Sequence, residues 1–187
     1  MTTEAKLLTA EEFMLLPEPL EGGKMELVRG EVVTMAPVGG EHGSVASELV
    51  GKLRLFCREH DLGQAAVEVG YRLQREPDLV RAPDVSFLEA ARLEEGRFPR
   101  SFVDGPPTLA VEVVSPGDRD VDLSTKVEEY LAAGARRVWL VRPGLRTITV
   151  HRPNGDAHTY RAGDTLSSDD AGFDVEGFAL RVDEVFA

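Results

Sequence analysis

Glu112 is the one polar residue in the stretch LAVEVV, which runs from Leu109 to Val114. A short, nearly continuous apolar run of this kind is typical of a strand that is buried on both faces of a sheet. A carboxylate in such a strand is costly to bury unless it is paired with a cation or bound to a metal ion. The stretch therefore predicts that Glu112 has a charged partner.

A second carboxylate, Asp84, follows Pro83 at the start of the strand-like segment DVSFLE. On neighbouring strands Asp84 and Glu112 would lie side by side, and their repulsion would raise one of the two pKa values unless a cation lay between them. Oxygen ligands without cysteine or a histidine cluster favour Mg²⁺ or Mn²⁺. We therefore expect Asp84 and Glu112 to be the ligands of such an ion.

Lys126 lies at the edge of the apolar face of a predicted helix, beside Leu123 and Tyr130. Its stem can extend along the sheet and bring the ammonium group to Glu112, where it could orient a water molecule and offset charge on a phosphate. Alternatives stay open at this point. Lys126 could pair with Asp122 or Glu129 on its own helix, Asp84 could cap a turn, and Glu112 could belong to a structural ion pair.

The elements that must position these groups follow from the hydrophobic pattern. Thr9 and Glu12 form a capping box before a short helix that runs to Leu16. The turn at Arg29-Gly30 joins the strands of a hairpin, and a strand–helix–strand step after Val111 suggests a right-handed parallel crossover. The remaining predicted elements are a helix over 42–60, strands over 65–74, 82–89 and 108–114, a helix over 121–133, a strand over 136–141 and a hairpin over 146–161.

This order predicts an α/β fold in which a mixed central sheet is flanked by helices and extended by the N- and C-terminal hairpins. At 187 residues the chain is expected to form one domain over 1–187. Its core would span about 40–142, with an N-terminal helix and hairpin over 9–36 and a C-terminal hairpin over 146–161 followed by a tail.

The chain carries a net charge of −12, which repels nucleic acid at long range, so that any contact with DNA must be local. Its single cysteine, Cys57, cannot form an internal disulfide, and the N-terminus lacks the pattern of a signal peptide. No stretch has the length of apolar sequence that a membrane span needs. These features predict a cytoplasmic protein that does not enter a membrane.

The segments PDVSF (83–87) and LAVEVVSPGDRDVDLSTKVEEYLAAGARRVWLV (109–141) resemble the putative restriction endonuclease family, a family built on a domain of unknown function within the PD-(D/E)XK nuclease superfamily. The similarity also includes MELVRGEVVTMAP and the helix start EHGSVASELVGKL. It implies a restriction-endonuclease-like αβββαβ core, in which Asp84 and Glu112 hold a divalent metal. The sequence departs from the superfamily motif at Val114, where (D/E)XK has lysine. In relatives of this family the lysine lies on the following helix, and the resemblance implies that Lys126 takes that place here.

The superfamily often adds an acid from the first core helix, for which Glu48 is the better candidate and Glu41 the lesser. Glu68 on the first core strand and Glu26 in the N-terminal hairpin could also point at the site. His42 is a candidate general base, although a histidine at a helix start often forms only local hydrogen bonds.

The resulting expectation is an endonuclease that hydrolyses DNA phosphodiester bonds with Mg²⁺ or Mn²⁺. Asp84, Glu112 and the backbone carbonyl of Val113 would hold the metal, and Lys126 would position the attacking water. Two alternatives remain: a catalytically inactive nuclease-fold module for interaction or assembly, and a metal-dependent hydrolase acting on RNA or other phosphate esters.

Contacts with nucleic acid are expected from the segment 134–161, which holds six arginines against one acid, Asp156. Within it Arg136, Arg137 and Arg146 are the candidate phosphate contacts, although solvated arginines that balance acids elsewhere would give the same pattern. The hairpins could also pair edge strands between two copies, which predicts a homodimer.

Overall fold

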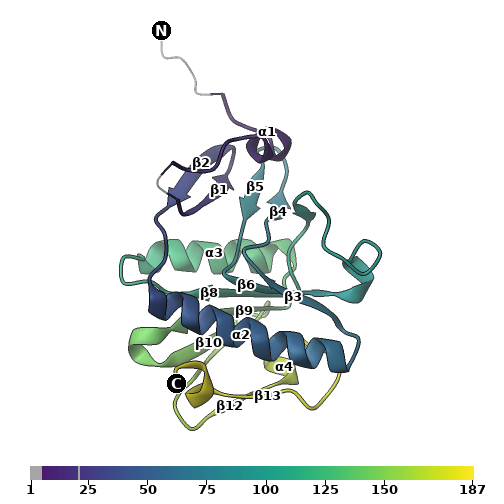
Figure 1. Cartoon of the computed structure of the whole chain (residues 1–187), viewed down its shortest axis with the longest axis vertical. Helices are drawn as coiled ribbons and strands as arrows, with labels where there is room; N and C mark the ends of the chain where they lie inside the picture. The colour runs from purple at the N-terminus through teal and green to yellow at the C-terminus, as the bar shows by residue number, and fades with distance from the viewer. Residues whose placement is uncertain (1–5, 21) are drawn as a thin grey trace.

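The structure is a computed structural model that describes residues 6–20 and 22–187. Its centre is a six-stranded sheet in the order β11-β10-β9-β8-β6-β3 (Figure 1). The strands are β3 (Gly63–Val67), β6 (Val85–Glu89), β8 (Leu109–Val113), β9 (Arg137–Arg142), β10 (Thr147–His151) and β11 (Ala157–Tyr160). The pair β8–β9 is parallel and the other pairs are antiparallel, so the predicted mixed sheet and parallel crossover are confirmed.

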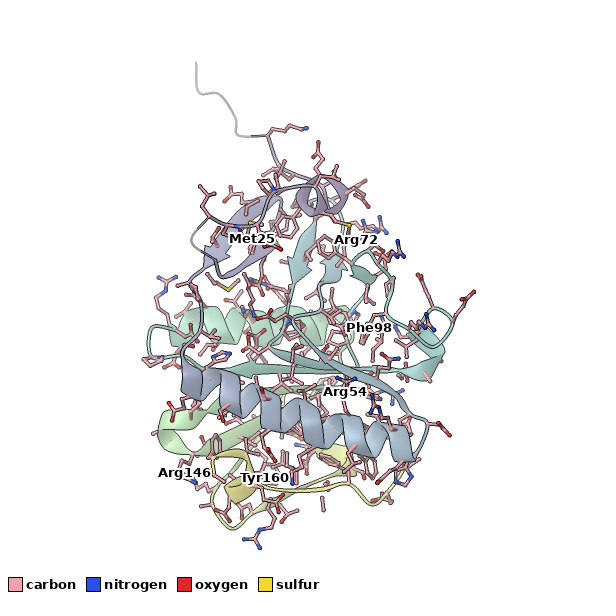
Figure 2. The ribbon with its side chains drawn as sticks, in the orientation of Figure 1. Met25, Arg54, Arg72, Phe98, Arg146 and Tyr160 are labelled. Carbon is pink, nitrogen blue, oxygen red and sulfur yellow. The ribbon has the colours of Figure 1, made fainter. Side chains whose placement is uncertain are left out.

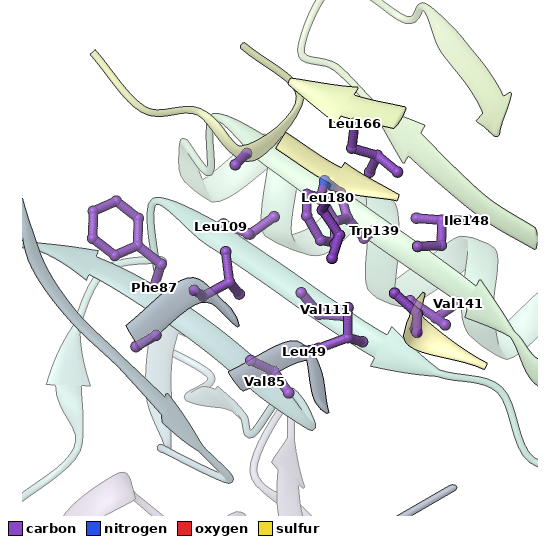
Figure 3. Close-up of a cluster of buried hydrophobic side chains, with 14 of the residues drawn as sticks. Leu49, Val85, Phe87, Leu109, Val111, Trp139, Val141, Ile148, Leu166 and Leu180 are labelled. Carbon is purple, nitrogen blue, oxygen red and sulfur yellow. The ribbon is translucent and has the colours of Figure 1, made fainter. Parts of the chain in front are cut away.

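Two helices cover the two faces of this sheet. Helix α2 (Gly40–Glu59) packs with Val111 and Val113 in the larger core cluster, part of which Figure 3 shows. Helix α3 (Asp120–Ala133) packs with Ala110 on the other face. Because successive side chains of a strand point to opposite faces, Glu112 shares the α3 face with Ala110.

A second sheet lies beside the first, in the order β2-β1-β5-β4-β7 (Figure 1). Its strands are β1 (Lys24–Val28), β2 (Glu31–Met35), β4 (Tyr71–Gln74), β5 (Leu79–Arg81) and β7 (Val103–Asp104), and the short helix α1 (Ala10–Met14) precedes them. The N-terminal hairpin belongs to this sheet, so the expectation that it extends the central sheet was wrong. The C-terminal hairpin β10–β11 does extend the central sheet, as expected.

The segment 65–74 is two strands in two sheets, not the single strand that its alternation suggests. Glu68 has a φ of 53°, in the left-handed region, which ends β3 just before it. A Cβ at Gly70 would lie 2.4 Å from the Phe102 ring, so this glycine permits the close approach of the two segments. The break directs the chain from the central sheet into the second sheet.

The predicted start of α1 and the predicted end of α3 are confirmed, although α1 ends at Met14 and not at Leu16. Thr9 and Glu12 form a capping box at α1, and Gly134 ends α3 with a φ of 109°. The sequence pattern missed the small elements of the C-terminal tail and two short 3-10 turns. These are β12 (Thr165–Ser167), α4 (Ser168–Ala171), β13 (Ala179–Arg181), α5 (Val182–Val185), η1 (Ala90–Arg92) and η2 (Pro143–Leu145).

The tail completes the larger core, because Leu166, Leu180, Val182 and Val185 are buried in the same cluster as the residues of α2. Figure 3 shows Leu166 and Leu180 beside Trp139 of β9. Within the part of the chain that the structure describes, no helix has both the length and the apolar character to cross a membrane.

Candidate active site

Glu112 lies on β8, and Asp84 immediately precedes the adjacent strand β6. Val85 pairs with Val111 in the antiparallel register of β6 and β8, so one step further along sets Asp84 beside Glu112. Both side chains are buried, with residue exposures of 8% and 4%. The predicted juxtaposition of these two acids therefore follows from the register.

Glu112 is held by two side chains of α3. The Lys126 ammonium donates to Oε2 at 2.9 Å, and the Tyr130 hydroxyl donates to Oε1 at 2.9 Å. Lys126 and Tyr130 are four residues apart and so lie on one face of the helix. The local partners considered for Lys126 are engaged elsewhere, since Asp122 pairs with Arg119 at 2.7 Å and Glu129 with Arg81 at 2.7 Å.

Burial and neighbouring charges together shift the pKa values of Glu112 and Lys126. Removal from water raises the pKa of Glu112, although the Lys126 and Lys24 charges oppose the shift. Burial would lower the pKa of Lys126, but the charges of Glu112 and Glu26 outweigh burial and raise it. Lys126 is thus a cation at neutral pH.

Asp84 is contacted from three directions. The Lys24 ammonium donates to Oδ1 at 2.9 Å, the Val113 amide donates to Oδ2 at 2.7 Å, and His42 Nε2 lies 3.3 Å from Oδ2. Burial would raise the pKa of Asp84, but the His42 hydrogen bond and the Lys24 charge outweigh it and lower this pKa. Asp84 is therefore an anion over the ordinary pH range.

Val113 and His42 both contact Asp84, one through its backbone and the other through its ring. The contact of Val113 with Asp84 is made by its amide, and a role for its backbone carbonyl as a metal ligand stays a prediction. His42, at the start of α2, also contacts Ser115 Oγ through Nδ1 at 3.0 Å. The histidine ring is thus fixed between Ser115 and Asp84.

Glu26 of β1 is the third carboxylate of the cluster and is almost fully buried. Its Oε2 accepts from Arg81 at 2.7 Å, and its Oε1 lies 3.4 Å from the Lys126 ammonium. Burial would raise the pKa of Glu26, but the charges of Lys126 and Arg81 outweigh burial and lower it. Arg81 also binds Glu129, so a chain of alternating charges leads from α3 into the second sheet.

The structure does not bring the other candidate acids into this cluster. Glu48 is exposed on α2, where its carboxylate lies 3.7 Å from the Lys52 ammonium, and Glu41 is also exposed. Glu68 is exposed just after the end of β3. Helix α2 instead contributes His42.

Sequence reasoning missed three members of the cluster: Lys24, Arg81 and Tyr130. Two sequence patterns could have indicated Lys24 and Arg81. Lys24 and Glu26 alternate in KMELV, which places both on one face of a strand, and Arg81 interrupts the apolar run of LVRAPD. Tyr130 was assigned only to the apolar face of its helix.

The candidate nucleic-acid contacts Arg136 and Arg137 are engaged with acids. Arg136 pairs with Glu89 at 3.0 Å and with Asp174 at 2.8 Å, and Arg137 pairs with Asp169 at 2.5 Å. The guanidinium carbon of Arg146 lies 6.0 Å from the centre of the Phe186 ring. Figure 2 shows Arg146 on the opposite side of the central sheet from Met25 and Arg72 of the second sheet.

The donor set of the cluster fits Mg²⁺ or Mn²⁺. Among the described residues no group of three or more His, Cys, Asp or Glu side chains is arranged to hold a metal ion. Mg²⁺, however, is commonly bound by one or two carboxylates, with waters and substrate phosphate completing its shell. Each Glu112 oxygen has one hydrogen-bond donor in the described structure, and each oxygen of a carboxylate can accept two. Glu112 thus retains acceptor capacity for an ion.

Comparison with known proteins identifies both a structural relative and a family. A crystal structure of a putative nuclease belonging to DUF820 from Anabaena variabilis superposes with a TM-score of 0.79 and 21% sequence identity, over 96% of this chain and 97% of that chain. At this identity the match shows a shared fold. No curated protein matched the chain. The model of the Uma2 family, described as putative restriction endonuclease, matches residues 10–181, and the chain therefore belongs to that family.

Proposed function

We propose that the protein is a metal-dependent endonuclease that hydrolyses DNA phosphodiester bonds. The observation that carries this proposal is the pair of buried carboxylates Asp84 and Glu112, each of which is contacted by a lysine from a different element. Membership in a family described as putative restriction endonuclease supports the nuclease activity. The Lys24 charge helps to lower the pKa of Asp84, and the Lys126 and Lys24 charges oppose the rise that burial causes in the pKa of Glu112.

Asp84 and Glu112 would hold Mg²⁺ or Mn²⁺, which when bound supplies a water of lowered pKa and stabilises charge at the scissile phosphate. The Lys126 ammonium would position the attacking water and offset charge on the phosphate oxygens. In the overall reaction the oxygen of water bonds to phosphorus and gives up one proton to solvent, and the bond between phosphorus and the leaving oxygen breaks. The leaving oxygen keeps that electron pair and ends with a proton from solvent.

The remaining contacts would orient these groups. Tyr130 fixes the second oxygen of Glu112, and Glu26 holds Lys126 from the side of the second sheet. His42, itself contacted by Ser115, and the Val113 amide hold Asp84. Rigid partners of this kind keep metal-binding carboxylates in a productive orientation.

The test is cleavage of supercoiled plasmid DNA with Mg²⁺ or Mn²⁺, comparing wild type, Asp84→Asn and Lys52→Met. Lys52 is an exposed lysine that pairs with Glu184, and its substitution leaves the cluster intact. We expect nicked and linear products from wild type and Lys52→Met, and none from Asp84→Asn or in EDTA. Equal cleavage by Asp84→Asn would contradict the proposal. Cleavage of RNA in place of DNA would support the phosphodiester chemistry and correct the substrate, and no cleavage of either would favour an interaction module.

The expected homodimer is also a proposal. Strand β2 lies at the edge of the second sheet and exposes Val32 and Val33, which would suit edge-to-edge pairing with a second copy. Light scattering coupled to gel filtration measures the mass directly. A monomer at micromolar concentration would contradict this part of the proposal.

A further inference from the structure

Two lysines from different elements enter the carboxylate cluster. Lys126 comes from α3 and contacts Glu112, whereas Lys24 comes from β1 and contacts Asp84. Their side chains are 13% and 17% exposed, so both ammonium groups are largely removed from water. The resemblance to known nucleases accounts for one lysine, and Lys24 has no role in the proposed mechanism.

Lys24 is held firmly in this position. Its ammonium donates to the backbone carbonyl of Ala82 at 2.7 Å as well as to Asp84 at 2.9 Å. Burial would lower the pKa of Lys24, but the charges of Glu112 and Asp84 outweigh burial and raise it. Lys24 is therefore a cation that is sensitive to both proposed metal ligands.

Oδ2 of Asp84 already has two contacts. Oδ2 accepts from the Val113 amide and lies next to His42, which leaves Oδ1 as the more open oxygen. Lys24 binds that same Oδ1. A divalent ion that binds Asp84 would thus meet an ammonium group at the oxygen it needs, and two cations at one carboxylate oxygen repel each other strongly in a partly buried site.

We propose that Lys24 competes with the divalent metal for Asp84 in the free protein and binds the substrate phosphate once the metal is in place. The inference rests on the proposed function. A lysine ammonium suits this exchange because it is a compact point charge on a flexible stem, which can leave one oxygen anion for another. The nearest new anion in a nuclease complex is a phosphate oxygen of the substrate. Metal and substrate would then favour each other's binding, since the phosphate draws Lys24 away from Asp84.

The test measures Mn²⁺ binding by calorimetry without DNA, for wild type, Lys24→Met, Lys24→Arg, Asp84→Asn and the control Lys52→Met. We expect Lys24→Met to bind Mn²⁺ at least about tenfold more tightly than wild type, since a repelling charge is removed. Lys24→Arg and Lys52→Met should stay within about twofold of wild type, because each keeps the charge beside Asp84. Thermal unfolding and circular dichroism show whether each variant is folded.

Plasmid cleavage provides the second readout. Lys24→Met should lose about tenfold or more in cleavage rate at saturating Mn²⁺, since its phosphate contact is missing. Tighter metal binding together with slower cleavage supports the exchange, and a purely structural role for Lys24 would weaken both. Unchanged Mn²⁺ affinity in folded Lys24→Met would overturn the inference while leaving the proposed function intact. Mn²⁺ binding that persists in Asp84→Asn, or no binding to any variant, would overturn both.

Discussion

Glu112 and Asp170 are two buried carboxylates with similar partners and different surroundings. Each accepts a hydrogen bond from a tyrosine hydroxyl, Tyr130 at 2.9 Å and Tyr160 at 2.6 Å. Each also has a cation, Lys126 at 2.9 Å for Glu112 and Arg152 at 2.7 Å for Asp170. The two sites therefore begin from the same pair of contacts.

They differ in how much acceptor capacity is filled. Asp170 also accepts from the backbone amide and the hydroxyl of Ser167, both at 2.8 Å, so its two oxygens have four donors. Four donors saturate a carboxylate, whereas the two donors that the described structure gives Glu112 fill half of its capacity. Asp170 thus has the contacts of a structural acid, and Glu112 those of an acid that can still bind an ion.

The pKa shifts have opposite directions for the same reason. Burial alone would raise the pKa of Asp170, but the Tyr160 and Ser167 hydrogen bonds outweigh it and lower this pKa. Glu112, with fewer donors, keeps a pKa raised by burial. The cations differ as well, because a guanidinium binds carboxylates in a fixed fork and an ammonium is exchanged more easily.

The largest expected effect separates the two acids by activity. Glu112→Gln should lower plasmid cleavage at least about a thousandfold, because under the proposed function the variant loses a charged metal ligand. Asp170→Asn should cleave normally per folded molecule and unfold with about 2 kcal/mol less free energy, because buried hydrogen bonds to a charged acceptor are weakened. Cleavage assays and urea unfolding measure the two quantities. Loss of activity in folded Asp170→Asn would contradict the division into binding and structural acids.

The next effect tests the cations. Lys126→Met should lower the cleavage rate of the folded protein about a hundredfold, because in the proposed mechanism its ammonium acts on the water and the phosphate. It should also destabilise the fold, because it leaves the buried Glu112 without its cation. Arg152→Met should destabilise the fold by about 2 kcal/mol and leave the cleavage rate of the folded protein unchanged, since Arg152 pairs with Asp169 and Asp170 far along the chain from the cluster. A hundredfold loss of cleavage rate in Arg152→Met would show that the tail participates in the reaction.

A smaller effect is expected from the tyrosines. Tyr130→Phe should lower cleavage about tenfold, because the hydroxyl only orients the Glu112 oxygen that it contacts. Tyr160→Phe should cost about 1 kcal/mol of stability without a change in cleavage. Equal effects of the two substitutions on activity would remove the distinction between the two sites.

Much of the carboxylate cluster could be predicted from the sequence because its signals are local. An acid inside an apolar strand, a second acid after Pro83 and a lysine at the edge of a helix face are visible in single segments, and the register of β6 and β8 brings the first two together. Lys24 and Arg81 could not be placed in this way. Both belong to the second sheet, and the pattern of the N-terminal hairpin also fits an extension of the central sheet.

The contacts around Asp170 were also not predicted from the sequence, for a related physical reason. Asp170 lies in a tail of very short elements, where a four-residue helix has no periodicity to detect. Four of the six arginines counted between 134 and 161 are paired with acids outside that window: Arg136, Arg137, Arg142 and Arg152. Charge counted along the sequence did not give the charge of the folded surface.

The smallest effect is in the pH dependence of stability, where the two acids should have opposite signs. The folded-state pKa of Asp170 is lowered, so its contribution is present above the unfolded value near 3.8 and is lost as the pH falls through the folded pKa. The folded-state pKa of Glu112 is raised, so ionisation of the unfolded chain above about 4.5 lowers the stability as the pH rises toward the folded pKa.

Urea unfolding of wild type, Glu112→Gln and Asp170→Asn at several pH values from roughly 3 to 8 tests these signs. Relative to wild type, Glu112→Gln should gain stability as the pH rises, because the variant no longer has to bury an acid that ionises when unfolded. Asp170→Asn should lose stability relative to wild type over the same rise, because it lacks an anion that the fold stabilises. Shifts of the same sign in both variants would mean that the fold stabilises the Glu112 anion as fully as the Asp170 anion. Glu112 would then need no metal ion to balance its charge, which would weaken the proposed role of this acid as a metal ligand.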